Sequence, residues 1–321
     1  MTGAPAGLDL ASIRAIDVHV HVEIDRHGRR ALPDDLLEAS AKHFRSGPRT
    51  PTIDEIADHY RERRLAAVVF PVDVENSTGH PALSNEEIAE DAARHSDVLV
   101  PFASIHPAKG RAGARAFRRL VEGHGVRGIK FHPSLQGFAP DDRSAYPLLE
   151  VAAEHGVPAV FHTGQTGIGA GMPGGAGIRL KLSDPMLLDA VAADLPELTI
   201  IMAHPSFPWQ DAALAVALHK PNVYIDLSGW SPTYFPPQLV RYADTLLQDK
   251  VLFGSDYPLI TPDRWLADFE KLAIREQVRP KILKQNAVRV LGLTDRSATD
   301  PAAQTAQTVQ TAQTAQTQEV P

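Results

Sequence analysis

The chain has 321 residues, of which 43% are hydrophobic and 22% are charged, so its composition is that of a globular protein that can bury a large core. Its formal net charge of −7, with no continuous stripe of lysine or arginine, argues against nucleic acid as a partner. No apolar run is long enough to cross a bilayer and the N-terminus does not look like a signal peptide, which predicts a cytoplasmic protein without a membrane partner.

Short β-branched segments alternate with longer segments of helical character from residue 15 to residue 258. This alternation is typical of parallel strands joined by crossover helices. We expect eight strands, at residues 15–22, 66–73, 99–106, 128–133, 158–164, 198–205, 222–229 and 251–257. Because eight such strands close a barrel, the predicted fold class is α/β, a single (β/α)8 TIM barrel.

Helices are predicted between these strands, and the first of them has a clear start signal. Thr52 and Glu55 have the spacing of a capping box, in which each side chain satisfies a backbone N–H of the first helical turn. A last helical segment would close the barrel. The expected helices are residues 52–64, 84–95, 109–123, 144–155, 184–194, 209–219, 236–247, 263–274 and 280–291.

Two connections are longer than the few residues usual in α/β units, namely residues 23–51 after strand one and 165–183 after strand five. Both follow the C-terminal ends of strands, where a barrel binds its substrate, so we expect them to act as lids. The predicted domain limits are an N-terminal extension at 1–12, the barrel at 13–293, and a disordered tail at 297–321 that is built from Ala, Gln and Thr.

The first predicted strand carries His19 and His21, which are two residues apart and therefore point to the same side of the strand. Such a pair could grip one metal ion. The alternative is two ordinary structural histidines. Because the chain has no cysteine, disulfides are excluded and any metal must be held by nitrogen and oxygen ligands.

The later predicted strands also end in polar or ionisable side chains. Barrel enzymes place their catalytic groups at the C-terminal ends of the strands, so these side chains should meet at one mouth. Several histidines, a carboxylate and one open position are what a catalytic divalent ion needs to activate water or polarise a carbonyl. The strand-end residues are Lys130, His132, His162, His204, Asp226 and Asp256.

Together the segments IDVHVH, GIKFHP, VFHTG, IMAHPS and LFGSDYP resemble the amidohydrolase superfamily, and specifically the amidohydrolase-related branch that contains aminocarboxymuconate semialdehyde decarboxylase. The resemblance covers residues 13–293. It implies a metal-dependent enzyme, a homodimer, that acts on a small molecule with one divalent ion; Zn²⁺ is the expected ion and Mn²⁺ the alternative. The implied metal ligands are His19, His21, His162 and Asp256. The implied proton-transfer residues are His204 and Asp256.

A second metal is the less favoured alternative. In binuclear members of the superfamily a lysine of strand four is carbamylated and bridges two ions, which here would make Lys130 a bridge and His204 a ligand. The preferred interpretation is that Lys130 forms an ion pair or binds an acidic substrate. His132, two residues later, could hydrogen-bond the substrate or be structural.

Three further residues are candidate substrate contacts. Arg45 and Arg49, in the first long connection, could hold a carboxylate or phosphate with the planar guanidinium group, although a charged loop is usually only solvated. Trp230 follows strand seven and could form an aromatic wall of the site, or could simply pack.

Three functions are compatible with these residues. The first is a hydrolase that uses metal-activated water on a small carboxylated or β-keto substrate, which could be an aromatic-derived acyl thioester. The second is a nonoxidative decarboxylase of an aromatic or muconate-type acid; many such relatives have glutamate in place of the first histidine of the pair, so His19 favours the hydrolase. The third is an inactive barrel that serves as a binding scaffold, which the full set of candidate ligands argues against.

Overall fold

The computed structural model describes residues 7–44 and 49–293. Arg45 and the predicted tail at 297–321 lie outside the described residues. All eight strands are present, and each overlaps its predicted range. They are β1 (Ala15–His21), β2 (Leu65–Phe70), β3 (Leu99–Pro101), β4 (Ile129–Phe131), β5 (Ala159–His162), β6 (Ile200–Ala203), β7 (Val223–Asp226) and β8 (Val251–Leu252).

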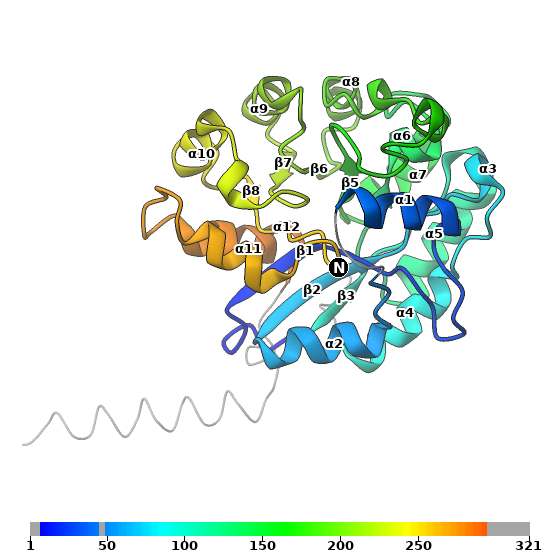
Figure 1. Ribbon diagram of the computed structural model, residues 1–321, viewed down its shortest axis with the longest axis horizontal. Helices are drawn as coiled ribbons and strands as arrows, with labels where there is room; N and C mark the ends of the chain where they lie inside the picture. Colours follow the sequence, from blue (N-terminus) through cyan, green and yellow to red (C-terminus); the bar gives the residue numbers. More distant parts are fainter. Residues whose placement is uncertain (1–6, 45–48, 294–321) are drawn as a thin grey trace, which may run out of the picture.

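The strands form a closed parallel barrel. Consecutive strands pair in parallel from β1 to β3 and from β4 to β8. Two single parallel bridges close the seams, one between Ala103 and Ile129 and one between Val20 and Tyr257. The predicted TIM barrel is confirmed, and the ring of helices around the strands is visible in Figure 1.

Each outer helix overlaps its predicted range and is shorter at one or both ends, most of all α11 (Pro262–Phe269), which was predicted to continue to residue 274. Thr52 and Glu55 form the predicted capping box: the Thr52 hydroxyl accepts a hydrogen bond from the Glu55 N–H at 3.3 Å, and the Glu55 carboxylate accepts one from the Thr52 N–H at 2.8 Å. These helices are α2 (Ile53–Glu62), α4 (Asn85–Arg94), α5 (Gly110–Gly123), α7 (Tyr146–Glu154), α8 (Leu187–Asp194), α9 (Gln210–His219), α10 (Pro237–Asp244) and α11 (Pro262–Phe269).

The segment predicted as one closing helix at 280–291 has two parts, a π-helical turn at Lys281–Gln285 and then α12 (Asn286–Val290). Two short helices that the sequence pattern did not reveal, α3 (Glu75–Thr78) and α6 (Pro133–Gln136), lie within a few residues of the ends of β2 and β4. Single turns of this kind are too short to show a helical period in the sequence.

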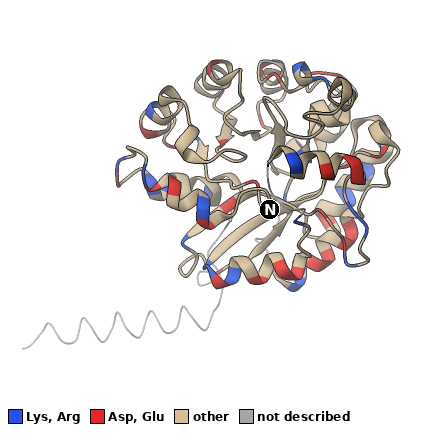
Figure 2. Cartoon of the chain, in the orientation of Figure 1, with Lys and Arg blue, Asp and Glu red and all other residues tan. Residues whose placement is uncertain are grey.

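Each strand contributes to two apolar layers, because successive side chains point to opposite faces. In β2, Ala67 and Val69 pack towards the outer helices, whereas Val68 and Phe70 pack in the barrel interior. Charged residues of both signs are interspersed over the outer helices (Figure 2). Among the described residues, no helix is both long and apolar enough to span a bilayer.

Both long connections are present, but the first contains a helix that the sequence pattern missed, α1 (Asp34–His43). Leu36 of α1 is buried against Val72 and Leu135, and Leu37 packs in the same cluster as Ile168 of the second connection. The apolar residues of α1 are few, so only this contact between the two connections reveals which side of the helix is buried. The connections therefore cover the mouth of the barrel together.

Candidate functional site

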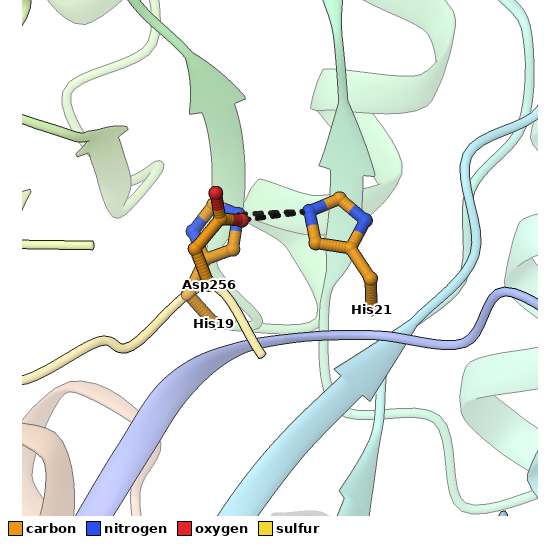
Figure 3. Close-up of side chains that lie close together, drawn as sticks. All are labelled: His19, His21 and Asp256. Atoms are coloured by element: carbon orange, nitrogen blue, oxygen red, sulfur yellow. Dashed lines mark hydrogen bonds and ion pairs between the residues drawn. The ribbon is translucent and has the colours of Figure 1, made fainter. Parts of the chain in front are cut away.

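The predicted histidine pair and the strand-eight aspartate meet at the mouth of the barrel. The Nε2 atoms of His19 and His21 are 3.3 Å apart. One carboxylate oxygen of Asp256, Oδ1, lies 3.4 Å from the His19 Nε2 and 3.1 Å from the His21 Nε2 (Figure 3). Two imidazole nitrogens and a carboxylate oxygen that converge in this way could hold a divalent ion.

The other ring nitrogen of His19 is anchored from behind by residues of β7 and the loop after it. The His19 Nδ1 lies 3.0 Å from the Asp226 carboxylate. The Ser228 hydroxyl donates to Asp226 and lies 3.0 Å from the His19 Nδ1 and 2.9 Å from the His204 Nδ1. His19, His204 and Asp226 are also close enough to hold an ion, but the Ser228 hydroxyl already joins these three side chains by hydrogen bonds. In metal sites, a carboxylate that hydrogen-bonds the second nitrogen of a ligating histidine fixes the orientation of the ring. The position of Asp226 behind His19 suits this role.

His162 lies beside His204 rather than with the three converging donors. The His162 Nδ1 is 2.9 Å from the His204 Nε2, and the His162 ring stacks on His132 with centroids 3.8 Å apart. Its Nε2 is buried and has no hydrogen-bond partner in the described part of the chain. Because buried polar atoms are nearly always paired, this nitrogen fits a ligand to an ion. The donor chemistry of the site therefore fits a bound divalent metal.

Two of these side chains extend from strained backbone. His204 and Asp256 both have φ of 70°, in the left-handed region that side chains other than glycine rarely adopt. Such strain is concentrated at functional sites, where the surrounding structure compensates for it. Gly229 gives His204 its space, because a Cβ atom at that position would lie 2.5 Å from the His204 Nδ1. The left-handed backbone at His204 and the glycine at position 229 together leave room for the His204 ring.

A cavity of about 480 Å³ opens over the donors. Most of the predicted site residues line it, together with several residues for which no role was predicted. The predicted residues in its wall are His21, Arg49, His132, His162, His204, Trp230 and Asp256. The wall also contains Glu23, Arg30, Phe44, Tyr234 and Arg264.

The amidohydrolase family model matches residues 16–293. The chain belongs to this amidohydrolase family. The match contains all the side chains described above, from His19 to Asp256. No curated protein matches the chain.

Solved structures with the same fold cover nearly the whole of this amidohydrolase. An uncharacterized TIM-barrel protein from Bordetella bronchiseptica is 23% identical, with a TM-score of 0.68 over 88% of this chain and 99% of its own. A dihydroxybenzoic acid decarboxylase from a Polaromonas species, solved with manganese and the inhibitor 2-nitroresorcinol, is 18% identical, with a TM-score of 0.62 over 88% and 97%. A probable 2-pyrone-4,6-dicarboxylic acid hydrolase from Acinetobacter baumannii is 16% identical, with a TM-score of 0.56 over 87% and 100%.

At these identities the structural likeness shows the fold alone. The family match shows the family, which confirms the resemblance predicted from the strand-end motifs. Together with the converging donors, it makes this protein a metal-dependent enzyme of the amidohydrolase family.

Burial and the neighbouring charges together set the pKa values at this amidohydrolase site. Burial, together with the nearby Lys130 ammonium, lowers the pKa of His19 to about 3. Burial alone would raise the pKa of Asp226 and Asp256, but neighbouring histidines lower it below the usual range: His19 acts on Asp226, and His21 acts on Asp256. Neutral imidazoles beside ionised carboxylates are the protonation states that bind a cation.

Lys130 lies beneath the converging donors, and its predicted contact with an acidic substrate stays a prediction. Its side chain is fully buried, does not line the cavity, and places its Nζ 3.1 Å from the His19 Nε2. Burial lowers the pKa of Lys130 to about 8. In the structure Lys130 is therefore a neighbour of the His19 Nε2 and is not among the residues that line the cavity.

Two residues were missed as site members, although the sequence contained a signal for each. Glu23 continues the alternation of His19 and His21, two residues further on. Ser228 stands two residues after Asp226, which was predicted to reach the mouth but was given no role. The period of two that revealed the histidine pair would have placed Glu23 and Ser228 at the same mouth.

Proposed function

We propose that this amidohydrolase is a metal-dependent decarboxylase that releases CO2 from a small aromatic carboxylic acid without an oxidant. The observation that carries the proposal is the position of His204, a buried imidazole in the wall of a cavity that aromatic side chains also line. Its ring centroid lies 4.9 Å from that of His19. Decarboxylases of aromatic acids recur among the structures of similar fold, which supports this reaction over hydrolysis.

His19, His21 and Asp256 would hold the divalent ion, and His162 would contribute the fourth ligand through its unpartnered Nε2. When bound, the ion would supply a positive charge that orients the substrate carboxylate. Imidazole and carboxylate ligands suit both Zn²⁺ and Mn²⁺, and the manganese in the similar Polaromonas decarboxylase makes Mn²⁺ the first ion to test.

His204 would supply the proton that replaces the carboxyl group. The bond between the ring carbon and the carboxyl carbon breaks, its electron pair stays on the ring carbon, and the proton from His204 forms the new C–H bond as CO2 leaves. Burial lowers the pKa of His204, but the negative charge of an arriving substrate favours its protonated form. Ser228 and Asp226 hold the ring in place from behind.

The cavity wall suits an aromatic acid. Trp230, Tyr234 and Phe44 offer aromatic surface for a ring. Arg49 would hold an anionic group that does not react, because a carboxylate bound tightly as an anion resists conversion to neutral CO2. Arg49 therefore contributes to binding more than to the chemical step.

The test is turnover of a panel of benzoate derivatives by the Mn²⁺-loaded protein, with CO2 measured directly. In D2O the product should carry deuterium at the carbon that lost the carboxyl group. Failure to release CO2 from any member of the panel, with the metal shown to be bound, would overturn the proposal.

Hydrolysis is the second candidate, and a specific feature favours it. Both histidines of the pair are present, and the Asp256 Oδ1 lies 3.1 Å from the His21 Nε2, where this carboxylate could accept a proton from water. Incorporation of ¹⁸O from H2¹⁸O into the carboxyl group of the acid formed from a lactone or thioester substrate, without CO2 release, would establish this reaction instead.

The homodimer remains a prediction that sedimentation of the purified protein would test.

A further inference from the structure

The carboxyl group of Glu23 stands in the cavity wall, two residues beyond His21. Its side chain is only 16% exposed. Its Oε2 atom is buried and has no hydrogen-bond partner within the described part of the chain. The backbone is fixed at this point, because the Glu23 carbonyl accepts a hydrogen bond of 2.9 Å from the Ala31 N–H. The backbone that carries this carboxyl group is therefore held in place.

Glu23 does not orient the His21 ring in the way that Asp226 orients the His19 ring. The Asp226 carboxylate lies 3.0 Å from the His19 Nδ1, within hydrogen-bond range. The Glu23 Oε1 lies 3.9 Å from the His21 Nδ1, which is too far for a hydrogen bond. Orienting the His21 ring therefore does not explain why the Glu23 carboxyl group is placed here.

An acceptor that is withdrawn from water and left without a donor is costly, and such atoms are rare in folded proteins. A ligand that brings a donor to this oxygen would remove that cost. A second anionic group is a poor partner, because the ionised carboxylates of Glu23 and Asp256, which both line the cavity, would repel it. The partner that fits is a neutral or cationic hydrogen-bond donor.

We propose that Glu23 determines substrate specificity by accepting a hydrogen bond from a hydroxyl or amino group that lies close to the reacting carboxylate. The inference rests on the decarboxylase proposed above. The donor must lie close to that carboxylate because Glu23 is next to His21, one of the three metal-binding side chains. Substrates would thus be hydroxylated or aminated aromatic acids rather than plain ones.

The experiment is calorimetric binding of benzoate, 2-hydroxybenzoate and 2-aminobenzoate to the Mn²⁺-loaded protein. The wild type should bind the two substituted acids about tenfold more tightly than benzoate, the size expected for a hydrogen bond to a charged group. Glu23→Leu removes the acceptor but keeps the bulk, and should abolish this preference without changing the affinity for benzoate. Glu23→Gln, which keeps one acceptor oxygen, should retain part of it.

Arg30→Gln is the matched control, because Arg30 lines the same cavity but is ion-paired with Asp34 at 2.9 Å. It should leave the preference intact. An unchanged preference in Glu23→Leu would overturn the inference, since chelation of the ion by the substituted acids would then explain it. Equal weakening of all three ligands together with loss of manganese would also overturn it, by making Glu23 a positioning residue for His21.

Absence of any preference in the wild type would overturn the inference as well. If Glu23→Leu does not fold, the Glu23→Gln variant decides, because a full wild-type preference there contradicts the role. Release of CO2 is measured separately. If Glu23→Leu loses the preference but the wild type releases no CO2 from any ligand, the decarboxylase proposal is overturned and Glu23 is still supported as the recognition group. If the wild type releases CO2 but the Glu23 variants keep the full preference, the decarboxylase is supported and the role of Glu23 is overturned.

Discussion

The two sides of the His19 ring have opposite characters. Behind the ring, Asp226 and Ser228 are fully buried and joined by hydrogen bonds to His19 and to each other. In front of it, Asp256 and the neighbouring Glu23 line an open cavity, and the Glu23 Oε2 is left without a partner in the described chain. The polar atoms behind the ring are satisfied by other protein groups, whereas the Glu23 Oε2 in front of it would need a ligand as its partner.

The difference shows how one histidine ring, that of His19, can be held rigidly on one side and face a binding cavity on the other. Saturated hydrogen bonds behind the ring hold its orientation, and second-layer carboxylates of this kind tune metal affinity. Under the proposed function, the unsaturated atoms in front of it would bind the ion and the substrate. Substitutions on the two sides should therefore have different signatures.

Removing the front donors should have the largest effect. We expect the His19→Ala, His21→Ala double variant to lose the bound ion and all activity, because two of the three converging donors disappear. Elemental analysis beside the wild type is the measurement, with about one ion per chain expected in the wild type for a mononuclear site. About two ions per chain would instead make Lys130 a carbamylated bridge.

Replacing His204 should separate metal binding from chemistry. His204→Ala should keep the ion but lower kcat by roughly 10²- to 10⁴-fold, the usual contribution of a general acid or base. Metal content and kcat are measured on the same preparation. If the ion is lost with the activity, His204 belongs to the metal ligands and its proposed role as proton donor is wrong.

A change behind the ring should act on affinity first. Asp226→Asn removes the charge that faces the His19 Nδ1, so we expect the affinity for Mn²⁺ to fall about 10- to 100-fold. The free energy of unfolding should fall by about 1–3 kcal/mol, since a buried hydrogen-bond network is disturbed. Metal titration and chemical denaturation measure the two effects. Wild-type values in both would remove the distinction between the two sides.

The smallest effect is expected at the cavity rim. Arg49→Gln should raise KM for an acidic substrate by about threefold to tenfold and leave kcat unchanged, because an exposed arginine adds only modest binding energy. Steady-state kinetics at low salt is the measurement, with Arg30→Gln as the paired-arginine control. A fall in kcat would place Arg49 in the chemical step instead.

Much of the site could be predicted because strand periodicity is a local property. The alternation in IDVHVH puts His19 and His21 on one side of β1 whatever the rest of the chain does. The barrel was predictable too, because eight apolar segments at regular spacing close in only one common way. The same local rule would also have placed Glu23 at the mouth.

What the sequence determined is thus the set of groups that reach the barrel mouth. Which of them touch was decided by the tertiary structure, since β7 and β1 are far apart in the chain and meet only when the barrel closes. That closure brings Asp226 behind His19 and places the His162 ring against His204 rather than with the three converging donors. Likewise α1 is fixed by its contacts with the second long connection. Distances of a few ångströms between side chains depend on register and barrel closure, which no local pattern encodes.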